Sequence, residues 1–482
     1  MKTLETEQII KQKRRNFGEH LTSVKIFQEY IFPYIKKDIY NYIWIDLYAG
    51  EGNLILPILE YIPHTERINF FRERIFLFDI QSELVEKSIT NAKYYGIPEK
   101  IARENIVQKD TLQQFPKNIL GKKLPIFHIT NPPYLYIGYI VKQGGRNLKY
   151  FDGVNEGYQD LYQIALINDL RNGIGKMIYI IPSNFLFGDS CSNKIRNDFL
   201  KFYDIQKVYF FENKIFEYTG THVGIFFFER RECICDKKLR FIGIKIKNGD
   251  SIKREYILKP ENNYRAGNNF EEFIKKYKAK REIKVKFYLT EKSILENKGN
   301  EVIEVINANK FNGKSYKREF IEVSVDFKKK ILSNILFVRT VDTGTLSGRA
   351  GLYEIKEVFG VDGIFVSNTF RTHPIQIFFS PTLSINDQIY LKKYFNLLLE
   401  YFRKIDDSEF LTTFKYSETE YTRKYMGLTR VKELIQTFPI LDLSEKNKME
   451  FRNFIDEKDT EKILKFIKDH NAEEYSDLFL KL

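Results

Sequence analysis

The sequence predicts an α/β protein with a doubly wound sheet, followed by a C-terminal α+β domain. Short β-branched or aromatic runs alternate with segments of helical period between residues 42 and 170, which is typical of such a sheet. This alternation stops after Arg231, where basic and aromatic residues interleave. A chain of 482 residues with 43% hydrophobic content suffices for two or three domains. We therefore expect one domain at residues 1–232 and another at 233–482.

The first domain is expected to have a Rossmann-like order of elements. Its predicted strands are residues 43–47, 75–78, 105–107, 126–129, 176–181, 206–211 and 224–228. Helices are expected at 82–95 and 158–172, the second closed by Gly173. Right-handed crossovers between parallel strands would then place a ligand at the carboxyl edge of the sheet.

In the second domain, residues 337–379 resemble short strands separated by glycine-rich turns. Residues 388–402 and 429–438 have helical period. These patterns predict an α+β arrangement.

Charge and cysteine content narrow the partners and the compartment. The net charge of +13 favours a polyanionic partner, and residues 236–330 hold 25 Lys and Arg against 14 Asp and Glu, an excess of 11. No apolar run is long enough to span a membrane. Three cysteines, Cys191, Cys233 and Cys235, form neither a disulfide framework nor a four-ligand zinc site. We expect a cytoplasmic protein with no metal site and no membrane contact.

A glycine-rich turn after the first strand is a candidate cofactor site. The run Ile-Asp-Leu-Tyr-Ala-Gly-Glu-Gly places Asp46 at the strand end and Gly50 and Gly52 in the turn, where glycine lets a ligand approach the backbone. A bare structural turn has the same pattern. Asp79 and Asp110 end the next two strands. Their carboxylates could accept hydrogen bonds from ribose hydroxyls and from an adenine amino group.

The same turn favours S-adenosylmethionine over a nicotinamide cofactor. A dinucleotide fingerprint has a third glycine and directs a helix N-terminus at a pyrophosphate, but position 55 is Ile. Asp46 would repel a pyrophosphate and would attract the cationic amino-acid part of S-adenosylmethionine.

The motif Asn-Pro-Pro-Tyr, Asn131 to Tyr134, follows the fourth predicted strand. An exocyclic adenine nitrogen is a poor nucleophile because its lone pair is delocalised into the ring. The Asn131 side-chain oxygen and a neighbouring carbonyl could accept from that amino group and direct its lone pair at a methyl donor. Pro132 and Pro133 would stiffen the loop and remove competing amide donors. Tyr134 could stack on a flipped base. An ordinary turn remains the alternative, although the preceding acidic strand ends favour a site.

With these residues in view, the chain resembles the γ-class of bacterial DNA adenine-N6 methyltransferases of type II restriction-modification systems. The resemblance lies in Asn-Phe-Gly-Glu-His-Leu-Thr-Ser at 16–23, the glycine-rich motif at 46–53, Asp79, Asp110 and Asn-Pro-Pro-Tyr. It covers about the first 230 residues, and it departs from the family in the Leu-Thr-Ser and Leu-Tyr positions of the first two motifs.

The resemblance implies contacts with S-adenosylmethionine from Thr22, Asp46, Ala49, Gly50, Gly52, Asp79, Asp110 and Pro133. It implies catalysis by Asn131, Pro132, Pro133 and Tyr134, and a second base-stacking partner in Phe216, for which core packing is an equal alternative. The partner would be duplex DNA, and a separate restriction endonuclease would cut unmodified sites without a stable complex.

The second domain would then recognise the DNA target. Arg339, Arg349 and Arg371 lie among Thr, Ser and Gly in strand-and-turn sequence, and arginine is the commonest reader of guanine. For each arginine a solvated basic surface is the plainer explanation.

Three other functions remain open. Asn-Pro-Pro-Tyr also occurs in methyltransferases of release-factor glutamine, which would not need so large a basic region, and in RNA adenine enzymes, which such a region would suit equally. A non-catalytic DNA-specificity subunit with a methyltransferase fold is the third.

Overall fold

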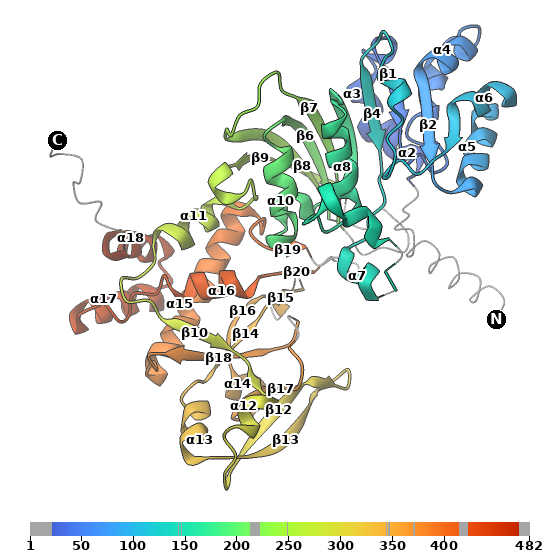
Figure 1. Cartoon of the computed structure of the whole chain (residues 1–482). Coiled ribbons are helices and arrows are strands. Elements are labelled where there is room, and N and C mark those ends of the chain that lie inside the picture. Colours follow the sequence, from blue (N-terminus) through green and yellow to red (C-terminus); the bar gives the residue numbers. More distant parts are fainter. Residues whose placement is uncertain are drawn as a thin grey trace. The chain divides into compact units, whose positions relative to one another are not determined.

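The computed structural model describes residues 22–142, 144–145, 147–212, 222–247, 249–343, 345, 348–369, 372–413 and 423–471. The chain divides into two compact units, Met1–Ala266 with Thr413–Thr422, and Gly267–Thr412 with Arg423–Leu482 (Figure 1). Each unit is described by itself below. Within the described ranges, no helix combines the length and the apolar character that a membrane span requires.

The first unit is built on a nine-stranded sheet with the order β3-β2-β1-β4-β5-β7-β6-β8-β9. The strands β3, β2, β1, β4 and β5 run parallel, and β7 is antiparallel to both β5 and β6. The strands are β1 (Ile43–Asp46), β2 (Ile75–Asp79), β3 (Ile106–Gln108), β4 (Ile126–Thr130), β5 (Lys176–Pro182), β6 (Tyr203–Phe211), β7 (Val223–Arg230), β8 (Leu239–Lys247) and β9 (Asp250–Leu258). All seven predicted strands of this region are therefore present.

Helices connect the parallel strands of this sheet. Every residue of β1, β2 and β4 is buried, because helices cover both faces of a parallel sheet. Gly173 has a φ of 73° directly after α8, so the predicted glycine stop is confirmed. The helices are α2 (Val24–Ile26), α3 (Phe32–Ile35), α4 (Arg67–Arg74), α5 (Ser82–Tyr94), α6 (Glu99–Asn105), α7 (Ile137–Lys142), α8 (Leu161–Arg171), α9 (Asn184–Phe187) and α10 (Ser190–Phe199).

The expected boundary at 232/233 lies within the first unit, between β7 and β8. Strand β8 pairs in parallel with β6, from Lys207↔Ile242 to Phe211↔Ile246, and β9 pairs with β8 as an antiparallel hairpin. Leu239 and Phe241 point into the core, while Arg240 between them is exposed. Arg240 thus lies on the solvent-facing half of an alternating strand, whereas Lys245 of the same strand is buried, with its Nζ 3.3 Å from Glu212 Oε1. The first unit continues to Ala266.

The second unit is the expected α+β arrangement. Two four-stranded sheets have the orders β10-β18-β14-β16 and β11-β17-β12-β13, and a three-stranded sheet has the order β15-β20-β19. The strands are β10 (Lys284–Phe287), β11 (Leu289–Thr290), β12 (Glu301–Phe311), β13 (Tyr316–Val323), β14 (Leu336–Arg339), β15 (Val341–Asp342), β16 (Gly351–Glu354), β17 (Gly363–Val366), β18 (Ile375–Ser380), β19 (Thr412–Thr413) and β20 (Lys424–Tyr425).

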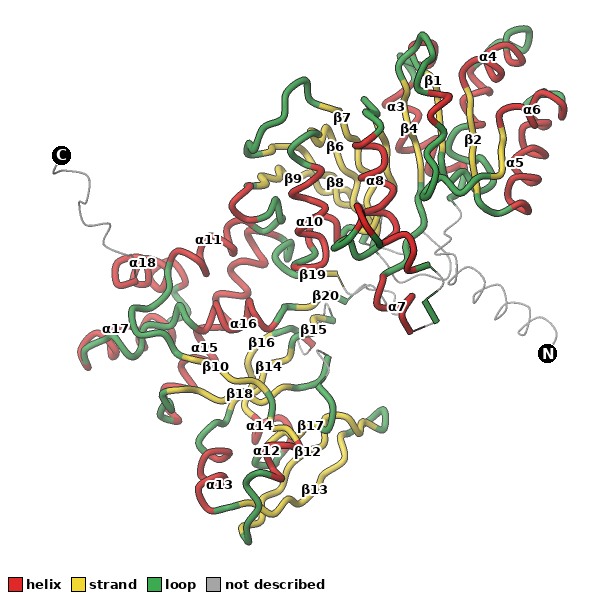
Figure 2. Tube along the Cα trace, in the orientation of Figure 1, coloured by secondary structure: helices red, strands yellow, loops and turns green. Residues whose placement is uncertain are grey.

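Figure 2 shows the long helix α15 beside α16, α17 and α18, whereas β12, β13 and β17 gather elsewhere in this unit. The sequence had indicated α15 and α16 but not the β12–β13 hairpin. The helices are α11 (Asn268–Lys276), α12 (Glu291–Leu295), α13 (Val325–Leu332), α14 (Ile355–Phe359), α15 (Ile385–Asp406), α16 (Leu428–Ile435), α17 (Glu445–Asp456) and α18 (Thr460–Asn471).

Candidate active site

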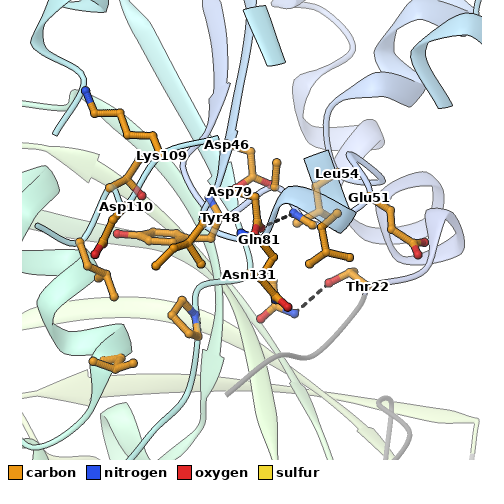
Figure 3. A pocket seen from close by; sticks show the side chains of 18 of the residues that line it. Thr22, Asp46, Tyr48, Glu51, Leu54, Asp79, Gln81, Lys109, Asp110 and Asn131 are labelled. Atoms are coloured by element: carbon orange, nitrogen blue, oxygen red, sulfur yellow. Dashed lines mark hydrogen bonds between the residues drawn. The ribbon is translucent and has the colours of Figure 1, made fainter. Parts of the chain in front are cut away.

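A cavity of about 970 Å³, partly open to solvent, lies where β1, β2, β3 and β4 end. The parallel strands bring their carboxyl ends to one edge of the sheet, where ligands of doubly wound folds bind. Figure 3 shows Tyr48 between Asp110 on one side and Asn131 with Thr22 on the other. The lining residues are Thr22, Asp46, Tyr48, Ala49, Gly50, Glu51, Asn53, Leu54, Asp79, Ile80, Gln81, Leu84, Lys109, Asp110, Thr111, Leu112, Asn131, Pro133, Asn147, Tyr150 and Leu161.

Asp46, the last residue of β1, is held by two neutral donors. The Thr130 Oγ1 hydroxyl donates to Asp46 Oδ1 at 2.5 Å, and the Tyr48 amide donates to the same oxygen at 2.9 Å. The side chain is 1% exposed. Burial raises the pKa of Asp46 to about 6, against the lowering effect of these hydrogen bonds. The carboxylate is therefore ionised at pH 7 and contributes negative charge to the cavity.

Asp79, the last residue of β2, is connected to the glycine-rich turn. Asp79 Oδ2 accepts from the Gly50 amide at 2.9 Å, and Asp79 Oδ1 accepts from the Gln81 amide at 2.8 Å. Each carboxylate oxygen can accept a further hydrogen bond. This geometry suits a ligand with two neighbouring hydroxyls.

The two glycines of the turn have different positions. Gly50 has a φ of 56° and lines the cavity. Gly52 has a φ of 80°, and a Cβ there would lie 2.6 Å from Leu56 Cδ1. Gly52 is described but does not line the cavity. Its positive φ fits the shape of the turn, and its contact with a ligand stays a prediction.

Asp110 follows β3 and already has protein partners. The Tyr150 hydroxyl donates to Asp110 Oδ2 at 2.8 Å, and Lys149 Nζ lies 4.0 Å from that oxygen. Burial, together with this carboxylate, raises the pKa of Tyr150, so its hydroxyl remains a donor at neutral pH. Tyr150 is 6% exposed and brings an aromatic ring to the cavity.

Asn131 begins the loop after β4, and two hydroxyl groups hold its carboxamide. Asn131 Nδ2 donates to Thr22 Oγ1 at 2.9 Å, while the Tyr134 hydroxyl donates to Asn131 Oδ1 and, at 2.5 Å, lies against the Ile180 carbonyl. A carbonyl oxygen can accept up to two hydrogen bonds. The amide orientation is thus set by contacts on both of its ends.

The predicted site residues fall into three groups. Thr22, Asp46, Ala49, Gly50, Asp79, Asp110, Asn131 and Pro133 line the cavity. Gly52, Pro132 and Tyr134 are described but do not line the cavity. Tyr134 is 4% exposed, and its ring and that of Tyr162 form an edge-to-face pair with 6.5 Å between the centroids. Phe216 and Arg371 lie outside the described residues.

The sequence analysis missed several lining residues. Ile80 and Thr111 directly follow Asp79 and Asp110, and Tyr48 lies two residues after Asp46, so closeness to the strand-end carboxylates could have identified them. Asn147, Tyr150 and Leu161 come from the segment after α7, and no motif in the sequence marks them.

The candidate DNA-contacting arginines of the second unit have intramolecular partners. The Arg339 guanidinium lies 4.7 Å from the ring centroid of Tyr353. Arg349 Nε lies 3.2 Å from Glu400 Oε1. The roles of Arg339 and Arg349 as DNA contacts stay predictions.

The lining chemistry is that of a site for a cationic, nucleoside-like ligand. Four of the lining side chains are carboxylates, from Asp46, Glu51, Asp79 and Asp110, and one is a lysine, Lys109. Outside the lining, Lys87 Nζ lies 3.1 Å from Glu51 and Lys149 Nζ lies 4.0 Å from Asp110. Leu54, Ile80, Leu84, Leu112 and Leu161 add apolar surface. Within the described ranges, no group of three or more His, Cys, Asp or Glu side chains is placed to hold a metal ion.

The sheet, the acidic cavity and the Asn-Pro-Pro-Tyr loop at its edge define a Rossmann-like methyltransferase. The chain belongs to the N-6 DNA Methylase family, whose model matches residues 11–321. The resemblance to adenine-N6 methyltransferases is thereby confirmed at the level of the family. None of the curated proteins matches this sequence.

Solved structures of restriction-modification proteins are similar to this chain at low identity. The type IIL enzyme MmeI in complex with DNA has a TM-score of 0.49 and 11% identity, over 92% of this chain and 71% of MmeI. A modification subunit of a putative type I restriction enzyme from Vibrio vulnificus YJ016 has a TM-score of 0.36 and 15% identity, over 72% and 61%. The DrdV–DNA complex has a TM-score of 0.39 and 14% identity, over 52% and 31%. This chain thus spans only 31% of the length of the DrdV chain and 61% of the length of the Vibrio vulnificus subunit.

Proposed function

We propose that this chain transfers a methyl group from S-adenosylmethionine to the exocyclic N6 of an adenine flipped out of duplex DNA. The observation that carries the proposal is the Asn131 carboxamide, which Thr22 and Tyr134 orient at the edge of a cavity lined by Asp46, Asp79 and Asp110. A flipped base can reach such an edge, whereas a base stacked in a duplex cannot.

The cavity residues suit S-adenosylmethionine. That cofactor supplies an electrophilic methyl group on a sulfonium centre. Asp79 would accept from the ribose hydroxyls, because two backbone amides already orient its oxygens. Asp46 and Glu51 would attract positive charge. The apolar side chains of Ile80 and Leu112 would contact the purine, with Asp110 accepting from its amino group alongside Tyr150.

Asn131 would act on the target base through its carbonyl oxygen. Oδ1 accepts from Tyr134, and a carbonyl oxygen can accept up to two hydrogen bonds, so the adenine amino group can donate to it. This contact holds the amino group in place and stabilises positive charge as the nitrogen attacks. Pro132 and Pro133 lack amide donors that would compete for the same oxygen.

Base stacking by Tyr134 and Phe216 belongs to this proposal. Tyr134 is 4% exposed, so stacking requires its ring to be uncovered when DNA binds.

The second unit would recognise the DNA sequence, with Arg339, Arg349 and Arg371 as candidate contacts. The excess of positive charge in residues 236–330, which span β8 and β9 of the first unit and the start of the second unit, suits phosphate binding. Methylation of one short sequence would protect host DNA from a separate restriction endonuclease of the same specificity.

The direct test is transfer of labelled methyl from S-adenosylmethionine to unmethylated duplex DNA, followed by nucleoside analysis and mapping of the modified sites. N6-methyladenine at one short sequence is expected. Structured RNA offered in competition provides the contrast, because preferential labelling of RNA would overturn the DNA assignment. Failure of the protein to bind the cofactor would instead support a non-catalytic specificity subunit.

The cofactor assignment has its own test in Asp79→Ala. Loss of the ribose acceptor should weaken S-adenosylmethionine binding by about tenfold or more, measured by calorimetry. Gln108→Ala is the matched control, because Gln108 pairs with Asp79 in the sheet but is exposed and does not line the cavity. Unchanged affinity in Asp79→Ala, or equal losses in both variants, would contradict the assignment.

A further inference from the structure

Three buried polar side chains lie outside the lining of the cofactor cavity and have no part in the mechanism above. His128 comes from β4, Asp169 from α8 and Tyr179 from β5, and each is 0% exposed. His128 Nδ1 lies 2.5 Å from Asp169 Oδ2, and the Tyr179 hydroxyl donates to the same oxygen at 2.6 Å. Burying three polar groups costs free energy, which their hydrogen bonds must offset.

The fourth member of this network is a backbone amide of the cofactor-binding turn. The Leu47 amide donates to His128 Nε2 at 3.2 Å. Strand β1 ends at Asp46, and its pairing with β4 ends at Ile45↔His128. The imidazole therefore accepts from the first amide beyond the strand.

These contacts define the tautomer of His128. Nε2 faces an N–H donor, so it carries no proton. Nδ1 then carries the proton and donates it to Asp169. Burial and the Asp169 charge raise the pKa of Tyr179 well above its usual value, so Tyr179 also stays a donor. Asp169 Oδ1 has no hydrogen-bond partner among the described residues, which leaves both donors on the one oxygen nearest the imidazole.

The Leu47 peptide groups are held from both sides. The Thr111 hydroxyl donates to the Leu47 carbonyl at 2.6 Å, opposite to the amide that His128 accepts. Asp46 and Tyr48, the two neighbours of Leu47, both line the cavity. The Tyr48 amide also donates to the Asp46 carboxylate. The backbone direction at Leu47 therefore decides where two cavity side chains point.

We propose that His128 is a positioning residue for the cofactor site: its neutral imidazole, held by Asp169 and Tyr179, accepts the Leu47 amide and thereby sets Asp46 and Tyr48. His128 touches neither cofactor nor substrate in this assignment. The cofactor part of the proposal rests on the proposed function, whereas the Nδ1–H tautomer and the Leu47 hydrogen bond do not.

A matched pair of substitutions separates the two ends of the imidazole. His128→Asn places an amide near Nδ1, so it retains a donor to Asp169 and loses the acceptor for Leu47. His128→Gln places an amide oxygen near Nε2, so it retains the acceptor. Leaving a buried amide unsatisfied should raise the cofactor Kd about tenfold in His128→Asn. In His128→Gln the Kd should stay within about threefold of the wild type.

Three readouts distinguish positioning from mere core packing. In His128→Asn the KM for S-adenosylmethionine should rise while kcat at saturating cofactor stays within about twofold. Hydrogen exchange of the peptide spanning Leu47 should accelerate in His128→Asn more than in His128→Gln. Equal effects of the two substitutions on Kd, or an unchanged Kd in a folded His128→Asn, would overturn the proposal.

Two further measurements cover poor folding and failure of the proposed function. Nitrogen-15 NMR of the wild-type imidazoles should show one histidine fixed as the Nδ1–H tautomer, and the Nε2–H form would overturn the proposal. Tyr179→Phe removes one of the two donors to Asp169 but keeps the imidazole and the Leu47 contact, so its Kd should rise less than that of His128→Asn. If the wild type binds no S-adenosylmethionine, the proposed function and the cofactor part fall together, while tautomer and amide exchange still decide the His128–Leu47 contact.

Discussion

Asp46 and Asp79 at the cavity of the first unit and two buried carboxylates of the second unit have different hydrogen-bonding partners. In the first unit, Asp46 accepts from a hydroxyl and a backbone amide, and Asp79 accepts from two backbone amides. In the second unit, Asp342 lies 2.6 Å from Arg403, and Glu271 lies 2.6 Å from Arg430. The partners are neutral in the first case and cationic in the second.

The partner of a buried carboxylate therefore indicates its role. A carboxylate held by neutral donors keeps its charge and can attract a cation. A carboxylate beside an arginine is neutralised, and its main effect is to tie two elements together. Substitutions should therefore affect ligand chemistry in the first unit and stability in the second.

The largest expected effect is loss of methyl transfer in Asn131→Ala. Without the carbonyl oxygen, the adenine amino group loses its acceptor, and kcat should fall by about a thousandfold. Cofactor affinity and Tm should stay near the wild-type values. Asn131→Asp is the matched control because it keeps acceptor oxygens and should retain more activity. Substantial transfer by Asn131→Ala, or a loss of stability sufficient to explain its inactivity, would contradict the assignment.

Next in size is the loss of stability in Arg403→Met. The substitution removes the guanidinium that lies 2.6 Å from the Asp342 carboxylate, in a site where both side chains are 6% exposed. The free energy of unfolding should fall by about 3–5 kcal/mol, measured by denaturant titration. The double variant Arg403→Met/Asp342→Leu should recover most of it. A change in cofactor affinity without a change in stability would break the comparison between the units.

A smaller effect is expected from the pH dependence of cofactor binding. Burial raises the pKa of Asp46 to about 6, above its usual 3.8, so the folded protein loses this negative charge as the pH falls through 6. From pH 7 to pH 5, the affinity for cationic S-adenosylmethionine should drop roughly tenfold. Calorimetry at both pH values measures the change. In Asp46→Asn the affinity should be lower at pH 7 and nearly independent of pH, and a wild-type slope in that variant would assign the titration elsewhere.

The smallest effect is expected from Arg339→Ala. As a base-reading residue, Arg339 should contribute about tenfold to DNA affinity and to the preference for one base of the recognised sequence. We expect no larger contribution to DNA affinity, because the Arg339 guanidinium already contacts the ring of Tyr353. Arg318→Ala is the control, because Arg318 is an exposed arginine paired with Glu304 at 3.2 Å. Equal losses in both variants would indicate phosphate attraction without sequence readout.

Much of the site was predictable because its residues follow buried strands. Asp46 and Asp79 come directly after apolar runs, Asp110 lies two residues after strand β3, and Asn131 comes directly after strand β4. These four strands are parallel in the structure. Parallel strands necessarily present equivalent ends at one edge, so position along the chain implied proximity in space. The strand bounds were also predictable within a few residues, because buried parallel strands are almost wholly apolar.

Other features depended on contacts between distant segments. Strands β8 and β9 join the sheet through pairing with β6, and their basic outward faces hid that pairing. The Tyr150 contact with Asp110 joins residues 40 positions apart. Tyr134 was expected to offer a stacking face, but the structure places its hydroxyl between Asn131 and Ile180.

The sequence by itself determined the class of the fold and the strand ends at which the cavity-lining residues Asp46, Asp79, Asp110 and Asn131 lie. Apolar periodicity and the residues at strand ends are local properties of the sequence. They can be identified without knowing which segments pack against them. Only the tertiary structure decided the boundary between the two units, the partners of each carboxylate and the hydrogen bond from the Leu47 amide to His128. A hydrogen bond between residues 81 positions apart exists only after strands pair, and no local pattern encodes it.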